Sequence, residues 1–363
     1  MGRARLRDLG IVLGHWPPGP RNALTDVPGV LVGHATVVRD APRVARTGVT
    51  VIVPRGGALA SRWFAGFESF NGNGEVTGLL WVAESGLLTT PIAITNTQDV
   101  GTVRDALSAL LLEADPAARF VLPVAAETYD GWLSDMRARH VGRAEVEAAL
   151  RAATDGPVAE GNVGGGTGMI CHEFKGGIGT ASRRVTTRSG AYTVGALVQA
   201  NYGHRRLLRV DGVPVGREID DARVPSAWGA PRHEAGSIIA VLATDAPLLP
   251  GQCARLARRA TVGLARVGGV GHDGSGDVFV AFATGNEVPG DAPGPATVRM
   301  LPNAQLDPLF EGAAEAVEEA IVNALTAAET ATGFQGRVAY ALPLDALRAV
   351  MARYAPRGGS SVD

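Results

Sequence analysis

The sequence of 363 residues lacks several features that are typical of disulfide-rich, zinc-binding and membrane proteins. It contains only two cysteines, Cys171 and Cys253, which lie far apart and form no C-x-x-C pair. This excludes a disulfide framework and a cysteine-based zinc site, and it suits a reducing cytoplasm. The apolar runs stop at roughly half the ~20 residues that a membrane-crossing helix needs. We therefore expect a soluble, cytoplasmic protein with no membrane partner.

An excess of charge is also absent. Lys and Arg together number 34 and Asp and Glu 36, which gives a net charge of −2. Without a long-range field of either sign, nucleic acid and anionic lipid are poor candidates for partners. The amino terminus starts basic, but Asp8, Gly10 and a proline cluster interrupt it before an apolar segment of signal-peptide length forms. We expect no export signal.

The common catalytic and cofactor motifs are missing too. No serine lies in a G-x-S-x-G nucleophile elbow, and the seven histidines form neither H-E-x-x-H nor an i, i+4 pair. The glycine-rich stretch 161–168 runs into Met169 without the Gly-Lys-Ser/Thr of a P-loop. Residues 269–274 match G-x-G-x-x-G, but they follow a predicted helix and precede a predicted strand, the reverse of the dinucleotide-binding order. The sequence predicts no metal and no cofactor.

Glycine, by contrast, is abundant, and the 48 glycines gather in clusters that are typical of tight turns and close backbone approach. Short segments rich in Val, Ile and Ala between these clusters read as strands covered on both faces. They are residues 27–38, 49–54, 91–95, 120–125, 192–199, 238–244 and 278–284. Apolar residues at helical spacing predict helices over 105–112, 143–153, 250–267, 306–328 and 344–354. The mixture indicates sheets packed inside helical layers.

One stretch fits a compact domain poorly. Residues 210–236 have no sustained period, three prolines and many charges, and they end abruptly at the apolar strand that Ser237 begins. The plain interpretation is a long surface loop, whereas the sharper one is a processing loop that is cut between Gly236 and Ser237. A serine freed in this way gains an α-amine of pKa near 7.7–8, which can act as the base for its own hydroxyl.

Several motifs in series resemble one family, the DmpA-type aminopeptidases, which include the L-aminopeptidase/D-amidase and the β-peptidyl aminopeptidases. The motifs are NALTDVPGVLVGH at 22–34, RTGVT at 46–50, NGNGE at 71–75, GNVGGGTGM at 161–169, KGGIGT at 175–180 and the Gly236-Ser237 pair. The resemblance implies an α+β fold, a four-layer αββα sandwich like that of amino-terminal-nucleophile hydrolases. It also implies self-cleavage of the single-domain precursor 1–363 into a larger chain, 1–236, and a smaller chain, 237–363, which stay together.

The resemblance also assigns residues. Ser237 matches the nucleophile, and Gly274-Ser-Gly-Asp277 is similar to the family's Ser-Gly-acid motif, whose hydroxyl and carboxylate hydrogen-bond around the nucleophile. In this chain these are Ser275 and Asp277, and the acid is Asp where relatives often have Glu, one methylene longer. Without the family, Ser275 and Asp277 read as a turn.

Two further residues match the oxyanion hole of the family, where donors stabilise the developing negative charge. They are Asn201, at the end of a predicted strand, and Tyr129, whose hydroxyl is placed beside the nucleophile. Their plain interpretations are a turn residue and a half-buried packing aromatic. Glu127 matches the carboxylate that anchors the substrate's ammonium group by a charge-assisted hydrogen bond, and otherwise reads as a solvated glutamate.

The remaining motif residues have less defined roles. Residues 162–168 either line the cleft with backbone N–H groups or let strands and helices approach closely. His34 and His272 lie in matching motifs, but the proposed mechanism needs no imidazole, so both are expected to be structural. The resemblance further suggests a homo-oligomer of processed pairs.

The leading hypothesis is an aminopeptidase that hydrolyses short peptides, amides or esters with a free amine through an acyl-enzyme on Ser237. A nylon-oligomer-type amidase or an acyltransferase on the same scaffold is the alternative, although such enzymes tend to use threonine as the nucleophile. From another class, an unprocessed binding protein remains possible and predicts one intact chain. The sequence does not distinguish L-, D- and β-amino substrates, because pocket shape reads these differences.

Overall fold

Two β-sheets form the centre of the molecule, as the runs of Val, Ile and Ala require. The computed structural model describes residues 2–54, 61–228, 236–289 and 294–354. The larger sheet has the strand order β4-β3-β12-β11-β10-β9, in which β11 and β12 run parallel and the other neighbours antiparallel. Its strands are β3 (Ser61–Gly72), β4 (Leu87–Leu88), β9 (Gly177–Thr187), β10 (Gly190–Asn201), β11 (Gly236–Thr244) and β12 (Ser275–Pro289).

The smaller sheet has the order β1-β2-β5-β6, with a parallel pair at β5 and β6. Its strands are β1 (Leu31–Arg39), β2 (Ala45–Val53), β5 (Ile92–Asn96) and β6 (Val124–Thr128). Two short hairpins are formed by β7 (Ile170–Cys171) with β8 (Phe174–Lys175) and by β13 (Ala331–Thr332) with β14 (Val338–Ala339). Because β5 and β6 are parallel, their carboxyl ends lie at the same edge of the sheet.

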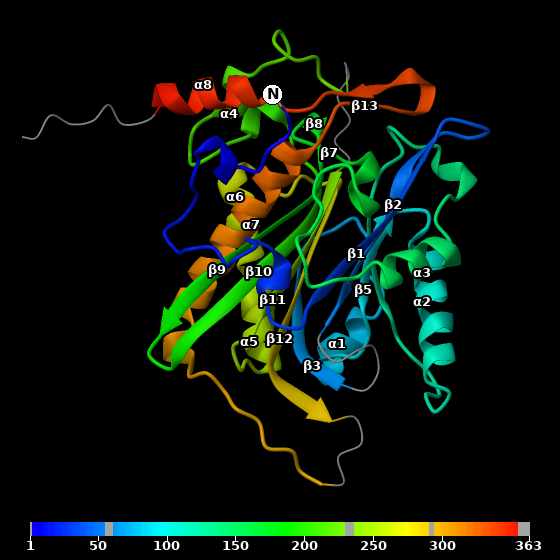
Figure 1. The fold of residues 1–363 in the computed structure, drawn as a ribbon, viewed down its shortest axis with the longest axis vertical. Helices are drawn as coiled ribbons and strands as arrows, with labels where there is room; N and C mark the ends of the chain where they lie inside the picture. Colours follow the sequence, from blue (N-terminus) through cyan, green and yellow to red (C-terminus); the bar gives the residue numbers. More distant parts are fainter. Residues whose placement is uncertain (1, 55–60, 229–235, 290–293, 355–363) are drawn as a thin grey trace, which may run out of the picture.

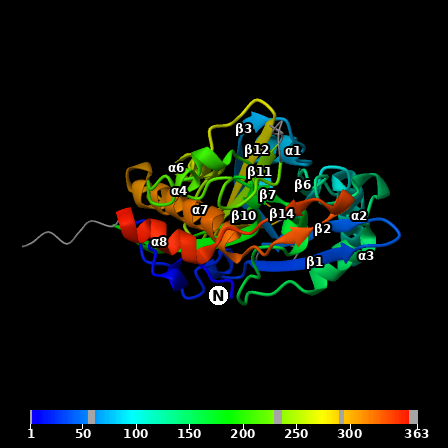
Figure 2. The same ribbon diagram turned by 90° about the horizontal axis from the view of Figure 1, so that it is seen from above.

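Helices cover the outer face of each sheet (Figures 1 and 2). The helices of the described part of the chain are α1 (Leu79–Ser85), α2 (Val100–Ala114), α3 (Arg143–Arg151), α4 (Val215–Glu218), α5 (Pro250–Arg258), α6 (Ala260–Val267), α7 (Asp307–Ala327) and α8 (Leu344–Tyr354). The 3₁₀ turns are η1 (Arg7–Leu9), η2 (Leu24–Asp26), η3 (Met136–Ala138), η4 (Gly164–Gly168), η5 (Arg205–Leu207), η6 (Asn303–Gln305) and η7 (Phe334–Gly336). None of the helices in the described part of the chain is long and apolar enough to cross a membrane.

The four-layer αββα arrangement that the resemblance implies is confirmed. Helices α2 and α3 pack on the smaller sheet, helices α5 to α7 cover the larger sheet, and the two sheets face each other. Three apolar clusters fill the three interfaces, and strands β5, β6 and β11 are buried on both faces along their whole length. This is why the strands read as continuous apolar runs instead of alternating ones.

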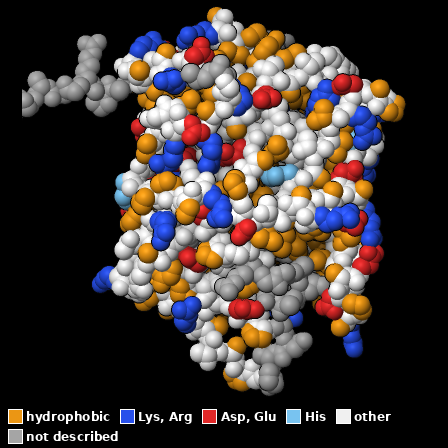
Figure 3. Space-filling view, in the orientation of Figure 1, with side chains coloured by type: hydrophobic (Ala, Val, Ile, Leu, Met, Phe, Trp, Pro, Cys, Tyr) orange, Lys and Arg blue, Asp and Glu red, His pale blue; other side chains and the backbone are white. Residues whose placement is uncertain are grey.

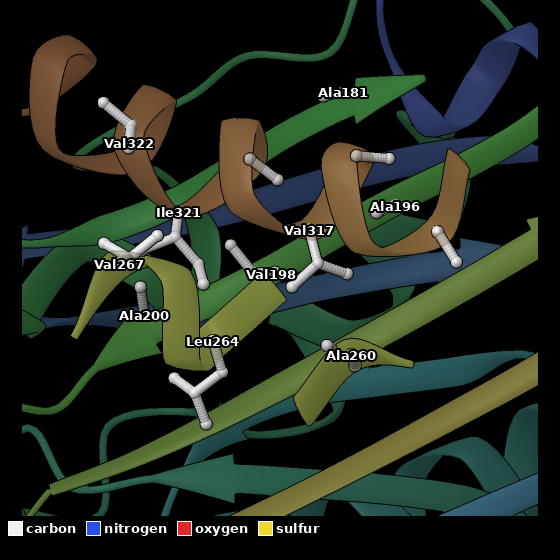
Figure 4. Close-up of a cluster of buried hydrophobic side chains, with 14 of the residues drawn as sticks. Ala181, Ala196, Val198, Ala200, Ala260, Leu264, Val267, Val317, Ile321 and Val322 are labelled. Carbon is white, nitrogen blue, oxygen red and sulfur yellow. The ribbon is translucent and has the colours of Figure 1, made fainter. Parts of the chain in front are cut away.

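Small side chains let the long helix approach the larger sheet closely. In Figure 4, Val317, Ile321 and Leu264 of the helical layer lie over Ala196 and Ala200 of β10. Gly179 of β9 has no room for a side chain, because a Cβ there would lie 1.9 Å from the Ala320 carbonyl oxygen. The Ala- and Gly-rich composition of these elements thus sets a short distance between layers.

Several predicted elements differ from the observed ones. The single helix predicted over 250–267 is two helices that meet at Arg259, because α5 packs on β3 and β12 whereas α6 packs on α7. The strand predicted over 120–125 begins only at Val124, after a proline that cannot donate to a ladder, and the Phe120 side chain is 72% exposed. Strands β3 and β9 and helix α1 were not predicted, since their patterns are interrupted by polar residues and glycine.

The prediction of a structureless segment over 210–236 is wrong for its first part. This part contains α4, and Val215, Ile219 and Val224 belong to the main core. The buried Arg205 guanidinium donates to the carbonyl oxygens of Val224 and Pro225. The segment is therefore anchored up to Trp228; residues 229–235 lie outside the described part of the chain.

The larger sheet interleaves residues from both sides of the Gly236-Ser237 junction. Strands β3 and β10 precede the junction, and β11 and β12, which follow it, lie between them. Ion pairs also connect the residues before the junction with those after it, because Glu319 of α7 binds both Arg183 of β9 and Arg7 of the amino-terminal segment. The surface carries Arg and Asp/Glu side chains without a large patch of one sign on the face in Figure 3.

Candidate active site

Ser237 lies in the middle of the larger sheet. It is the second residue of β11, and it pairs with Asn201 of β10 on one side and with Gly276 of β12 on the other. Its hydroxyl oxygen accepts a hydrogen bond from the Gly276 backbone N–H at 3.1 Å, and the residue is 5% exposed. The sequence-predicted nucleophile is thus held by neighbours on two strands.

Gly236, the other half of the predicted cleavage site, is held in the same strand. A Cβ at this position would lie 2.7 Å from the Asn201 carbonyl oxygen and 2.9 Å from Tyr202 Cα. Only glycine fits here without displacing backbone, so the residue type at position 236 follows from the closeness of β10.

Ser275 and Asp277 form a small network beside Ser237. The Ser275 hydroxyl donates to Asp277 Oδ1 at 2.7 Å, and the same oxygen accepts from the Ile238 backbone N–H at 3.2 Å. The carboxylate therefore contacts the residue after Ser237, and the structure gives no direct bond from it to the Ser237 hydroxyl. Burial raises the pKa of Asp277 to about 6, and the two hydrogen bonds oppose this rise.

Asn201 ends β10, as predicted, with a side-chain amide in a defined orientation. Its Oδ1 accepts from the Ile170 backbone N–H at 2.8 Å, and its Nδ2 donates to the Tyr129 carbonyl oxygen at 2.9 Å. A backbone N–H can only donate and a carbonyl can only accept, so both ends of the amide are assigned without ambiguity. One Nδ2 hydrogen remains for another acceptor, next to Ser237.

Tyr129 contributes to this cluster through its backbone. Its carbonyl oxygen binds Asn201, as described, while its side chain is 40% exposed. The hydroxyl has no hydrogen-bond partner within the described part of the chain. The structure thus brings Tyr129 to the site without fixing its hydroxyl on Ser237.

Glu127 lies at the end of β6, buried to 3% exposure, and is not the solvated glutamate of the plain interpretation. Its Oε1 accepts from the Glu75 backbone N–H at 3.0 Å, and its Oε2 accepts from the Thr97 hydroxyl. Burial raises its pKa, and the hydrogen bonds from Thr97 and Glu75 oppose this rise. Among the described residues no cation pairs with this carboxylate, which therefore suits a cationic ligand.

Gly74 separates Glu127 from the nucleophile's strand neighbour. A Cβ on Gly74 would lie 3.2 Å from Gly276 Cα and 3.3 Å from Glu127 Oε1. The Asn73 side chain donates to the Gly274 carbonyl oxygen, and the Asn73 N–H to that of Ser275. The motif at 71–75 thus clamps the loop that carries Ser275, a role that sequence reasoning left unassigned.

Thr97 was also missed, although a signal existed. It follows β5 as Glu127 ends β6, and the two strands are parallel neighbours in which Thr95 pairs with Glu127. Polar residues after two such strands meet at one sheet edge. Recognising β5 and β6 as a parallel pair would have placed them together.

The glycine-rich stretch proves to be a packing element. Gly164–Gly168 form the buried turn η4 between the sheets, and a Cβ on Gly165 would lie 2.1 Å from Gln199 Oε1. The N–H groups of Gly164 and Gly165 donate to Thr36 and Thr50 inside the protein. They are therefore not available to line a cleft.

His34 and His272 have structural contacts, as expected. His34 Nδ1 lies 2.9 Å from the Thr50 hydroxyl, and burial lowers the His34 pKa to about 4. The His272 ring packs edge-on against His204, and its carbonyl oxygen accepts from the Asn71 side chain. Both cysteines are free and buried. The described residues contain no cluster of His, Cys, Asp or Glu with the arrangement of a metal site.

Comparison with known proteins agrees with this geometry. Residues 22–339 match the profile of Peptidase family S58. The chain is 45% identical to the β-peptidyl aminopeptidase BapA of Sphingosinicella microcystinivorans, over 96% of this chain and 92% of BapA.

Solved structures are also similar. A β-aminopeptidase of Burkholderia sp. has a TM-score of 0.92 and 54% identity, covering 98% of this chain and 100% of its own. The L-aminopeptidase D-Ala-esterase/amidase of Ochrobactrum anthropi, described as a prototype serine aminopeptidase with a variant of the Ntn hydrolase fold, has a TM-score of 0.90 and 42% identity, with coverage of 96% and 98%. The resemblance drawn from the motifs is confirmed, and the chain belongs to Peptidase family S58 as an aminopeptidase with an Ntn hydrolase fold.

Proposed function

We propose that this aminopeptidase makes its own nucleophile by cutting between Gly236 and Ser237, and that the freed Ser237 then hydrolyses short peptides, amides or esters that carry a free amine. The observation that carries the proposal is the pairing of Ser237 with Asn201 and Gly276 on neighbouring strands. The Ser237 hydroxyl thereby lies between Asn201, whose amide is the proposed oxyanion donor, and the Gly276 backbone N–H.

The processing step is an acyl shift within the chain. The Ser237 hydroxyl attacks the Gly236 carbonyl carbon, the C–N bond breaks as the C–O bond forms, and the nitrogen takes up a proton. Water then hydrolyses the resulting ester, which leaves a carboxylate on Gly236 and an α-amine on Ser237. The Asp277 network supports this step because its bond to the Ile238 N–H holds the residue that follows the nucleophile.

Turnover uses the same atoms with a new base. The free α-amine accepts the proton of the Ser237 hydroxyl, whose oxygen attacks the substrate carbonyl and forms a tetrahedral oxyanion. The remaining Nδ2 hydrogen of Asn201 donates to this oxyanion, and the Tyr129 hydroxyl is the second donor we assign. The leaving amine departs protonated, and water releases the acyl group.

Substrate choice depends on Glu127. Its buried carboxylate lies one glycine away from Gly276, and a substrate ammonium at this point gains a charge-assisted hydrogen bond. Two of the relatives are named for L-aminopeptidase and β-peptidyl aminopeptidase activities, which supports substrates of these kinds. We propose that the substrates include β-aminoacyl compounds.

The intact mass of the purified protein tests the proposal. Wild type should give two polypeptides of about 24 and 13 kDa from the 37.4 kDa chain, while Ser237→Ala should remain whole. An uncut wild-type chain that still hydrolyses amides would exclude Ser237 as the proposed nucleophile. One intact chain without any hydrolysis would favour an unprocessed binding protein.

We further propose a cytoplasmic homo-oligomer of processed pairs. The free state of both cysteines supports a reducing compartment. Exposed apolar side chains support association, since Leu80 is 89% exposed and Phe120 72%. Light scattering of the processed protein tests the assembly, and a particle of 37.4 kDa would contradict it.

A further inference from the structure

The chain contains a single lysine, Lys175, whereas its other 33 Lys/Arg positions are arginine. This lysine is fully buried at the end of β8. Its Nζ donates to the carbonyl oxygens of Gly166 at 3.2 Å, Met169 at 2.8 Å and Gly176 at 2.8 Å. No carboxylate among the described residues forms an ion pair with it.

The geometry of this contact set favours an ammonium. Three carbonyl acceptors match the three N–H donors of a charged lysine, whereas a neutral amine has two. Burial lowers the Lys175 pKa to about 7, and acceptors around the nitrogen favour the charged form. A compact ammonium fits such a shell better than the planar fork of arginine, which accounts for a lysine in a chain that otherwise uses arginine.

One peptide group connects Lys175 to the oxyanion-hole residue. The carbonyl oxygen of Met169 accepts from Lys175 Nζ, and the Ile170 N–H of the same peptide donates to Asn201 Oδ1 at 2.8 Å. The peptide is planar, so fixing its carbonyl also fixes the direction of its N–H. The Gly176 N–H binds the same carbonyl at 2.9 Å and secures the position further.

The positive charge of Lys175 also polarises the groups along this connection. A cation at the carbonyl end of an amide polarises it and makes its N–H a stronger donor, and hydrogen bonds in a chain strengthen one another at low dielectric. The Asn201 amide is next in this series of hydrogen bonds, and Asn201 pairs with Ser237 across strands β10 and β11. A stronger donor there stabilises negative charge that develops only in the transition state.

We infer that Lys175 is a positioning residue that aligns and polarises Asn201 through the Met169–Ile170 peptide. The inference rests on the proposed function, because it takes Asn201 as the oxyanion donor. A lysine that only stabilised the turn would affect folding or substrate binding. Removal of a lysine that acts through Asn201 lowers kcat, and this effect requires that Asn201 be present.

A double-mutant cycle separates these roles. Lys175→Met, Asn201→Ala and the double variant are compared with wild type on an aminoacyl p-nitroanilide, with melting curves and intact masses as folding controls. Lys175→Met should lower kcat about 10- to 100-fold with KM changed less than about twofold. In the Asn201→Ala background the same substitution should change kcat less than about threefold.

Each other outcome has a distinct meaning. Equal losses from Lys175→Met in both backgrounds, or a rise in KM at unchanged kcat, overturn the inference and leave the role of Asn201 intact. If Asn201→Ala itself keeps the wild-type kcat, the proposed oxyanion role fails and the inference fails with it. If Lys175→Met does not fold, Lys175→Gln is used in its place, because glutamine keeps two N–H donors without the positive charge. The rate of cleavage at Gly236-Ser237 gives a second readout of the same cycle.

Discussion

Asn201 and Ser237 are directly opposite each other on the antiparallel strands β10 and β11. The backbone pairing of the sheet, and not a flexible loop, therefore sets the distance between the proposed nucleophile and its proposed oxyanion donor. Strands of a central sheet are among the most rigid elements of a fold, which suits a site that must be ready before the substrate arrives.

Glu127→Gln should separate amine recognition from the acyl-transfer chemistry. The variant keeps the shape and removes the charge, so cleavage at Gly236-Ser237 should survive, because that step involves no substrate amine. Free-amine substrates should lose about ten- to a hundredfold in kcat/KM, for a charge-assisted hydrogen bond of roughly 1.5–3 kcal/mol. The measurement compares free and acetylated aminoacyl p-nitroanilides.

Glu75→Gln is the matched control for this prediction, since Glu75 is exposed and its hydrogen bond to Glu127 comes from the backbone N–H. It should leave both substrates unchanged. An equal loss on free and acetylated substrates for Glu127→Gln would show that Glu127 supports the fold or the chemistry instead of reading the amine.

Gly74→Ala should narrow the space between Glu127 and Gly276. The added Cβ meets rigid backbone at 3.2 Å, so the Glu127 side chain has to yield and the amine site shifts. We expect KM for free-amine substrates to rise at least about fivefold, for an overpacking cost near 1 kcal/mol. Gly72→Ala, two residues earlier with open space around its Cβ, should leave KM unchanged. A similar KM for both variants contradicts the proposed position of the ammonium.

The pH dependence of processing should differ from that of turnover. The uncut chain has no α-amine at Ser237, so the Asp277 carboxyl, with its pKa of about 6, governs processing. Below this pH the protonated acid loses an acceptor for Ser275 and Ile238, and cleavage should slow. Turnover should instead increase as an amine with a pKa near or somewhat below 7.7–8 loses its proton.

Time courses of cleavage between about pH 5 and 8 test this prediction. Asp277→Asn keeps an acceptor that does not titrate in this range, and it should flatten the acidic limb of the processing profile. Coincident profiles for processing and turnover in the wild type would mean that one group controls both steps.

Prolonged dialysis against EDTA should leave processing and turnover unchanged. The mechanism uses an amine as the base and amide and hydroxyl donors for the oxyanion, so no step requires a Lewis acid. Loss of activity that zinc or manganese restores would overturn this account.

The sequence predicted much of the fold because long elements have strong periods. The helices that became α7 and α8 were predicted within about two residues, as is usual for sustained apolar stripes. Strand β9 was missed because Arg183 and Arg184 interrupt its apolar run, and only the tertiary structure shows that Arg183 is buried against Glu315 and Glu319.

The site divides in the same way. Ser237, Asn201 and Glu127 were predicted because motifs at several positions matched one family. Thr97 and Gly74 contact Glu127, which is distant in sequence, and a contact of this kind leaves no period or local spacing to read. The motif that contains Lys175 does not show that its side chain binds three carbonyl oxygens. The anchored segment before Trp228 was misread for a similar reason, since the buried Arg205 that holds it lies outside the segment.

The interleaved order of the larger sheet predicts that the proposed cut makes unfolding hard to reverse. Before the cut, one continuous chain brings β11 and β12 between β3 and β10. After the cut, the same hydrogen bonds hold two separate polymers, and a denatured sample would have to reinsert two adjacent strands into the middle of a sheet from a different molecule. Refolding becomes bimolecular and competes with aggregation. The cleaved protein should therefore show hysteresis between heating and cooling, which the uncut Ser237→Ala chain should lack.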